Sequence, residues 1–180
     1  MQNFYEMKIA GCKRKLPLCP VNEKMDIAAF IMFGDVELTV KAAKKLRGKV
    51  SEFDVILTPE AKSIPLAYEI ARQSKKPYIV ARKGLKLYMT DPLEVNVKSI
   101  TTENEQHLYL SCEEAESING KRVLIVDDVI STGESLLAVE ALVEKAGGKI
   151  VGKAAVLAEG DAAKRDDIVF LEPLPLFFKD

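Results

Sequence analysis

An apolar strand, a pair of acids, a small-residue loop and a helix follow one another in residues 123–135, VLIVDDVISTGES. The leading apolar residues predict a buried strand, and Asp127 and Asp128 stand where it ends. The Ser-Thr-Gly of residues 131–133 predicts a sharp turn whose backbone N–H groups and hydroxyls can bind an anion. The helix predicted over about 134–146 adds the positive end of its dipole. This order predicts a site in which two carboxylates accept hydrogen bonds from sugar hydroxyls while the loop holds a phosphate of the same molecule.

Two other interpretations of this stretch are weaker. The Asp-Asp pair could merely cap the next helix, but the strand and the loop would then share no ligand. A Walker phosphate loop requires Gly-Lys-Ser/Thr, whereas Gly133 is followed by Glu134 and Ser135. A phosphorylated sugar satisfies both the acids and the loop.

Composition narrows the class of protein. The 180 residues are 48% hydrophobic, which is enough for one domain with a substantial core. The 26 basic and 27 acidic residues leave a net charge of −1, so no overall field draws the chain to nucleic acid or to an anionic membrane. Three cysteines without zinc-site spacing favour reduced thiols, and no segment approaches a membrane span, so we expect a cytoplasmic protein. The single histidine argues against a His-dependent nucleophile or a zinc site built from several His.

Helical and strand periods alternate from about residue 35 onward, which predicts an α/β domain with a mostly parallel central sheet flanked by helices. Asp35 is a candidate N-cap for the first helix, and Gly48 ends it. The predicted buried face of this helix carries Val36, Val40 and Ala43. Similar patterns predict strands at 54–58, 78–81 and 149–158, a helix after residue 63, and an antiparallel pair at 94–102 and 107–111.

The stretch at 123–135 resembles the 5-phosphoribosyl-1-pyrophosphate (PRPP) signature of the type I phosphoribosyltransferases. The resemblance implies a single domain, residues 1–180, in which an antiparallel flap and a small hood are added to the α/β core. The hood would comprise about residues 1–30 and 160–180, and the core about 31–159.

The same resemblance implies roles for the residues of the signature. Asp127 and Asp128 would be catalytic, because they hold the ribose hydroxyls and stabilise an oxocarbenium-like sugar. The 5-phosphate would be bound by Ile130, Ser131, Thr132, Gly133, Glu134 and Ser135.

The turn after the strand at 54–58 places backbone N–H groups and a lysine at the start of a helix. Because the carboxyl ends of parallel strands meet at one edge of a sheet, this turn should open on the same crevice as the phosphate loop. Alone, a lysine in such a place is most often solvated. The turn resembles the pyrophosphate loop of the family, and Ser63 replaces the usual glycine, which puts pyrophosphate binding in question. The resemblance assigns pyrophosphate binding to Glu60, Ala61, Lys62 and Ser63.

Three cations lie close together in residues 82–87, RKGLKL. A charge run of this kind is usually a solvated face. The segment resembles the Arg-Lys-x-x-Lys-Leu stretch before the mobile flap of adenine phosphoribosyltransferases, where cations meet pyrophosphate, in some members across a dimer interface. The resemblance makes Arg82 a pyrophosphate-binding residue. It makes Lys83 and Lys86 catalytic, because they stabilise the charge that grows on the leaving group.

The residues that recognise the base are harder to find. Residues 11–21 and the tail 168–177 resemble the hood of the family, although they also fit the ordinary core of a lid. Lys153 and Glu159 lie near the last predicted sheet strand, where 6-oxopurine enzymes often use a lysine, but neither is in a recognisable motif. Because residues 82–87 most resemble the adenine branch, we favour adenine over hypoxanthine or xanthine.

Taken together, the resemblance implies a phosphoribosyltransferase of the adenine/xanthine branch, which joins a purine base to PRPP and releases pyrophosphate in purine salvage. Mg²⁺ is the implied cofactor, held mainly by the substrate with no direct protein ligand. PRPP and a nucleobase are the expected partners, with no nucleic acid and no membrane, and the family implies a homodimer. The alternatives are a non-catalytic PRPP-binding regulator and a xanthine/hypoxanthine phosphoribosyltransferase.

Overall fold

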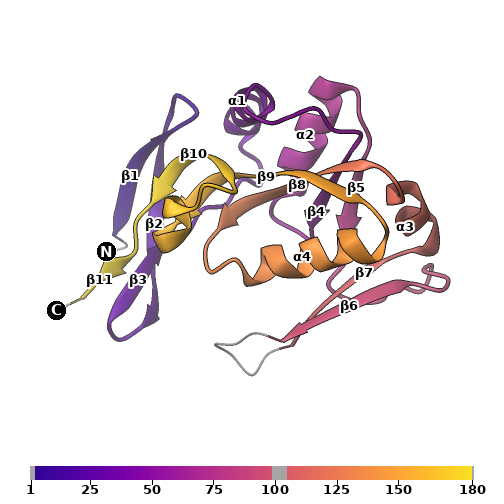
Figure 1. Ribbon diagram of the computed structural model, residues 1–180. Helices are drawn as coiled ribbons and strands as arrows, with labels where there is room; N and C mark the ends of the chain where they lie inside the picture. Colours follow the sequence, from indigo (N-terminus) through magenta and orange to yellow (C-terminus); the bar gives the residue numbers. More distant parts are fainter. Residues whose placement is uncertain (1–2, 99–104, 180) are drawn as a thin grey trace.

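The computed structural model describes residues 3–98 and 105–179, and its centre is a five-stranded sheet in which all neighbouring strands are parallel (Figure 1). The sheet confirms the predicted α/β class, and its strand order is β10-β9-β8-β4-β5. The strands are β4 (Val55–Pro59), β5 (Tyr78–Ala81), β8 (Arg122–Ile130), β9 (Lys149–Glu159) and β10 (Val169–Leu174).

The middle strand, β8, is longer than the sequence pattern indicates. Residues 123–126 are at most 1% exposed, as predicted for a strand covered on both faces. The prediction that the strand ends at Asp127 and Asp128 is wrong, because the ladder with β9 continues to Ile130, which pairs with Ala158. The two acids are therefore held by the sheet itself.

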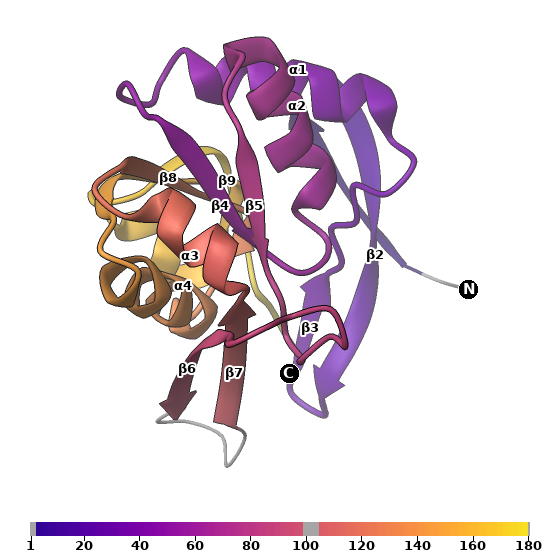
Figure 2. The same cartoon turned by 90° about the vertical axis from the view of Figure 1, so that its right-hand side faces the viewer.

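Helices cover both faces of the sheet (Figures 1 and 2). The helices α1 (Val36–Arg47) and α2 (Ile64–Ser74) lie on one face, and α3 (Cys112–Ile118) and α4 (Glu134–Lys145) lie on the other. Each face has its own cluster of buried apolar side chains. A short 3-10 helix, η1 (Gly160–Lys164), follows β9. In the described residues no helix is long and apolar enough to cross a membrane.

The first helix begins as predicted but turns a different face to the sheet. The Asp35 side chain accepts a hydrogen bond from the backbone N–H of Leu38, which confirms the N-cap. The predicted buried face is wrong for two of its three residues, since Val36 is 72% and Val40 is 38% exposed. The buried stripe of α1 consists of Leu38, Thr39, Ala42, Ala43 and Leu46.

The N-terminal strands and the last strand form a separate antiparallel sheet at one end of the molecule, which we call the hood (Figure 1). Of the C-terminal segment 160–180 that the resemblance assigns to the hood, only β11 pairs with hood strands, whereas β10 is the edge strand of the central sheet. The hood strands are β1 (Phe4–Ile9), β2 (Cys12–Asn22), β3 (Met25–Ala28) and β11 (Phe177–Phe178).

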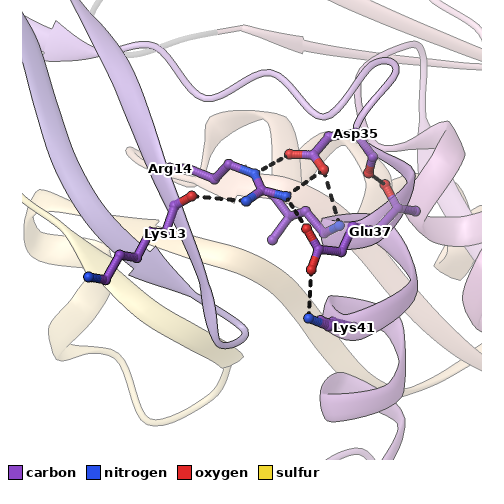
Figure 3. A network of polar contacts seen from close by, with 7 residues as sticks. Lys13, Arg14, Asp35, Glu37 and Lys41 are labelled. Carbon is purple, nitrogen blue, oxygen red and sulfur yellow. Dashed lines mark hydrogen bonds and ion pairs between the residues drawn. The ribbon is translucent and has the colours of Figure 1, made fainter.

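Arg14 of β2 ties the hood to the start of α1 (Figure 3). Its Nε lies 2.6 Å from Oδ2 of Asp35, and its Nη2 lies 2.9 Å from Oδ1 of Asp35 and 3.0 Å from Oε2 of Glu37. These hydrogen bonds raise the pKa of Arg14. Lys41 extends the network through Glu37. The carboxylate that caps α1 thus also fixes the position of the hood.

A two-stranded antiparallel hairpin, the flap, projects from the core (Figure 2). It consists of β6 (Leu93–Lys98) and β7 (Glu105–Leu110), which confirms the predicted antiparallel pair. The part of the prediction that covers residues 99–102 lies outside the described residues. The flap joins the core through a backbone bridge in which Arg82 and Tyr109 exchange two hydrogen bonds of 2.9 Å.

Candidate functional site

Three strand ends surround one cavity of about 210 Å³. The turn after β4, the segment after β5 and the last part of β8 all contribute to it, as expected for the carboxyl edge of a parallel sheet. Ser135, in the first turn of α4, also lines it. The lining residues are Pro59, Glu60, Ala61, Lys62, Ser63, Lys83, Asp127, Asp128, Val129 and Ser135.

Both acids line this cavity, Asp128 as a buried residue and Asp127 as a half-buried one. Asp128 is 3% exposed, and its Oδ2 lies 2.9 Å from Nζ of Lys62. The backbone N–H of Asp128 donates to Oδ1 of Asp127 at 2.8 Å. Burial, together with the neighbouring carboxylate of Asp128, raises the pKa of Asp127 to about 7. The site thus offers a ligand two adjacent carboxylates as hydrogen-bond acceptors, one of them paired with Lys62.

The raised pKa of Asp127 gives a testable pH dependence of stability. The carboxyl group is neutral in both the folded and the unfolded state below about pH 4, but only the folded state keeps the proton up to about pH 7. The wild-type protein therefore loses stability as pH rises through this window. We expect Asp127→Asn to match the wild-type melting temperature near pH 4 and to exceed it at pH 8, by roughly 2–4 °C for each kcal/mol.

Thermal unfolding across pH 4–8 measures this difference. Asp161→Asn is the control, because Asp161 is exposed and pairs with Lys164 at the surface. A difference that stays constant with pH, or a less stable Asp127→Asn at pH 8, contradicts the expectation.

The turn after β4 is held by its own side chains. Oγ1 of Thr58 lies 2.8 Å from the carbonyl oxygen of Val126, and the hydroxyl of Ser63 donates to the carbonyl of Pro59 at 3.1 Å. Ser63 is buried with φ −84°, a value open to any residue, so the turn does not require the glycine that Ser63 replaces. The Glu60–Ala61 peptide bond is cis. The Ser63 hydroxyl thus makes its hydrogen bond within the protein.

Two residues after β5 contact the carboxylate of Glu60, Lys83 through its backbone and Lys86 through its ammonium. The backbone N–H of Lys83 donates to Oε2 of Glu60 at 3.1 Å, and Nζ of Lys86 lies 3.8 Å from Oε1. Lys83 lines the cavity, whereas Lys86 and Arg82 are not among its lining residues. Nε of Arg82 is buried and has no hydrogen-bond partner in the part of the chain that the structure describes. Glu60 thus holds the start of the flap segment against the turn after β4.

The predicted phosphate loop lies between β8 and α4. Gly133 is the N-cap of α4 with φ +86°, a conformation that favours glycine. Ser131 and Thr132 are exposed, and Ser135 lines the cavity. Ile130 is 3% exposed, so its side chain belongs to the core and only its backbone is available to a ligand. The first N–H groups of α4 point out of the helix without intrahelical partners.

Two further basic residues lie near the site, and the sequence analysis considered only one of them, Lys153. Lys153 lies on β9, 17% exposed, and its ammonium pairs with Glu140 and Asp167, so it does not line the cavity. Arg165, which no motif singled out, packs against the phosphate loop: a Cβ at Gly133 would lie 2.8 Å from its Nη1. Only the fold brings Arg165 to that loop.

The model of the phosphoribosyl transferase domain matches residues 37–175 of this chain. The chain therefore belongs to the phosphoribosyltransferase family, as the signature at 123–135 indicated.

Its relatives differ in the base named for them. The chain is 40% identical over 115 residues to the hypoxanthine/guanine phosphoribosyltransferase of Methanococcus voltae, a match that covers 64% of this chain and 58% of the relative. It is 33% identical over 141 residues to the adenine phosphoribosyltransferase of Kosmotoga olearia, covering 78% and 74%. It is 32% identical over 124 residues to the xanthine phosphoribosyltransferase of an Exiguobacterium species, covering 68% and 63%. The match thus spans less than two thirds of two of these relatives.

The fold is shared with solved structures. The adenine phosphoribosyltransferase of Thermoanaerobacter pseudethanolicus superposes with a TM-score of 0.65 at 21% identity, covering 94% of this chain and 95% of that one. The purine phosphoribosyltransferase of Pyrococcus horikoshii gives a TM-score of 0.54 at 22% identity, covering 81% and 87%. These likenesses concern the fold.

Proposed function

We propose that the protein transfers the 5-phosphoribosyl group of PRPP to a purine base and releases pyrophosphate. One observation carries the proposal: a single cavity joins the acid pair of β8, the turn at 59–63, Lys83 and the first turn of α4. These groups come from four separate stretches of the chain. Each stretch offers what a different part of PRPP requires, namely acceptors for hydroxyls, cations for pyrophosphate and a helix start for the 5-phosphate.

The reaction needs no protein nucleophile. The bond between C1 of the ribose and the pyrophosphate oxygen breaks, and pyrophosphate leaves with the electron pair. A ring nitrogen of the base bonds to C1, and the proton of that nitrogen passes to solvent water. Asp127 and Asp128 accept hydrogen bonds from the ribose hydroxyls, and their negative charge stabilises the positive charge that develops on the sugar.

The cations are already paired with carboxylates. Lys62 is paired with Asp128, and Lys86 approaches Glu60. Binding of PRPP would exchange these carboxylates for pyrophosphate oxygens, which carry more charge. Because the charge on pyrophosphate grows only as the bond to C1 breaks, the lysines favour the transition state over the bound substrate.

The donor set suits Mg²⁺, which is the cofactor that we propose. Mg²⁺ prefers oxygen ligands and is usually bound through one or two carboxylates together with substrate phosphates. Asp127 and Asp128 offer such carboxylates, and Oδ2 of Asp128 is buried with Lys62 as its ion-pair partner. The ion would neutralise charge on the pyrophosphate. We infer that substrate oxygens hold it mainly.

The proposal is tested by incubating the protein with PRPP, Mg²⁺ and a panel of bases, and by following release of pyrophosphate and formation of the nucleoside monophosphate. Adenine, hypoxanthine, guanine, xanthine and orotate form the panel. Turnover with a purine but not with orotate supports the proposal. Binding of PRPP without turnover of any base favours the non-catalytic regulator instead, and failure to bind PRPP contradicts both.

Adenine is the base that we propose, and the position of Lys153 supports it. Its ammonium is held by Glu140 and Asp167, so it is not presented to a 6-oxo group in the cavity. A site built for the N6 amino group would reject 6-oxopurines through an unpaired polar group, by about 1–3 kcal/mol.

We expect Lys153→Met to leave the order of preference among bases unchanged, with adenine first. Steady-state kcat/KM for each base at saturating PRPP measures it. Lys149→Met, at the amino end of β9, is the matched control. A preference for hypoxanthine or xanthine that disappears in Lys153→Met would overturn the assignment of adenine.

We also propose a homodimer in the cytoplasm. The three cysteines are unpaired, as in a reducing compartment.

A groove of about 380 Å³ between α1 and α2 is bordered by exposed apolar side chains, which a second copy of the chain would bury. These are Val36, Val40, Tyr68 and Tyr78. The molecular mass in solution tests the dimer.

A further inference from the structure

Arg165 reaches the phosphate loop from a distant part of the chain. It follows η1, in the connection between β9 and β10, and its side chain is 31% exposed. The close approach of Nη1 to Gly133 means that the guanidinium occupies the space in which any larger residue would place its Cβ. Two features thus favour glycine at position 133: its φ of +86° and the space that it leaves for Arg165.

The orientation of the guanidinium is set by Asp167. Nε of Arg165 donates to Oδ1 of Asp167 at 2.8 Å, and Nη2 donates to Oδ2 at 2.7 Å. Asp167 is held in turn by Lys153, which also pairs with Glu140 of α4 at 2.8 Å. Nη1 makes no hydrogen bond within residues 3–98 and 105–179. Asp167 thus fixes the Nε and Nη2 edge of the guanidinium, and Nη1 lies beside Gly133.

The loop itself lacks a cation. Residues 127–135 contain three acids, Asp127, Asp128 and Glu134, and no lysine or arginine. A phosphate dianion bound there would meet N–H groups, hydroxyls and the helix dipole, but also the negative charge of these acids. A cation from another element would offset that repulsion.

We propose that Arg165 binds the phosphate of a phosphorylated sugar held at residues 131–135, with Nη1 as the donor and Asp167 as the positioning residue. This inference rests on the proposed function, because it assigns a further residue to the 5-phosphate end of the same site. Arg165 would act on the phosphate and not on the pyrophosphate, because Lys62 and Lys83 line the cavity, whereas Arg165 lies beside Gly133.

Isothermal titration calorimetry with ribose 5-phosphate and, separately, with inorganic pyrophosphate and Mg²⁺ tests the assignment. Arg165→Gln should weaken ribose 5-phosphate binding about tenfold or more and leave pyrophosphate binding unchanged. Arg165→Lys, which keeps the charge without the fork, should retain part of the affinity. Asp167→Asn should weaken ribose 5-phosphate binding less than Arg165→Gln does, because the guanidinium of Arg165 remains.

The matched control is Arg122→Gln. Arg122 makes the same two-point contact with an aspartate, Asp54, but lies at the amino end of β8, away from the cavity. It should leave both ligands unaffected. If a folded Arg165→Gln protein binds ribose 5-phosphate with wild-type affinity, the inference is wrong. It is also wrong if the affinities for ribose 5-phosphate and for pyrophosphate fall by the same factor. If the wild-type protein binds neither ribose 5-phosphate nor PRPP, the proposed function itself fails.

Discussion

Replacing both acids of β8, Asp127→Asn together with Asp128→Asn, is expected to lower the affinity for PRPP by roughly 10²–10⁴-fold. Hydrogen bonds from ligand hydroxyls to ionised carboxylates are worth about 1.5–3 kcal/mol each, and 1.4 kcal/mol corresponds to a factor of ten. The amides keep the shape of the side chains but remove both charges. Calorimetry with PRPP and Mg²⁺ at pH 8, where Asp127 is mostly ionised, measures the loss.

The two single variants should lower the affinity for PRPP to different extents. Asp128→Asn removes the carboxylate that pairs with Lys62, whose ammonium then becomes available to pyrophosphate and offsets part of the loss. Asp127→Asn leaves that ion pair in place. We therefore expect Asp127→Asn to weaken PRPP binding more than Asp128→Asn does.

A matched control removes the same charge elsewhere. Glu52→Gln together with Glu113→Gln neutralises two exposed carboxylates that do not line the cavity, and it should leave PRPP affinity unchanged. Unchanged affinity in a folded Asp127→Asn/Asp128→Asn protein would mean that the acids belong to the sheet alone. The assignment of the site would then be wrong.

Much of this site could be predicted because each part has a local pattern. The apolar run before Asp127 indicates a strand, and the turn at 59–63 follows another strand. A parallel sheet brings the carboxyl ends of its strands to one edge, so two local patterns become one cavity. The cation Lys83 joins them because it follows the neighbouring strand, β5.

The errors arise where local pattern leaves more than one solution. Val36 and Val40 have helical spacing, but so do Leu38 and Ala42, and tertiary packing selects the second stripe. The larger Leu38 buries more apolar surface, and Asp35, which caps the helix at Leu38 and pairs with Arg14, orients the helix start. No pattern within α1 distinguishes the two stripes.

Arg165 could not be found for a different reason. Its role depends on a contact between the connection after η1 and the loop before α4, which are far apart in the sequence. The positive φ of Gly133 has a local signal in Ser-Thr-Gly, but the space beside Gly133 has none. Such a pair becomes visible only when the sheet has set the two connections side by side.

Lys83→Ala is expected to reduce kcat roughly 10²-fold while changing the affinity for PRPP little. Removal of one preorganised donor that stabilises developing charge typically has this effect, and the charge on pyrophosphate develops only as the bond to C1 breaks. Lys86→Ala should have a smaller effect, because Nζ of Lys86 lies near Glu60 and is not among the cavity lining. Lys45→Ala, at an exposed position of α1, is the control. Steady-state kcat with the best base, beside calorimetric PRPP affinity, separates the two effects.

In the proposed homodimer, mixing two impaired variants tests whether Lys83 acts within its own chain. Lys83 and Asp127 line the same cavity of one chain. In a mixed dimer of Lys83→Ala and Asp127→Asn subunits, each cavity then lacks one of the two groups, so mixing should restore no activity. If Lys83 instead reached the partner's cavity, the mixed dimer would hold one cavity with both changes and one with neither. Activity would then return to about half of the wild-type value in each mixed dimer, and the placement of Lys83 in its own cavity would be wrong in solution.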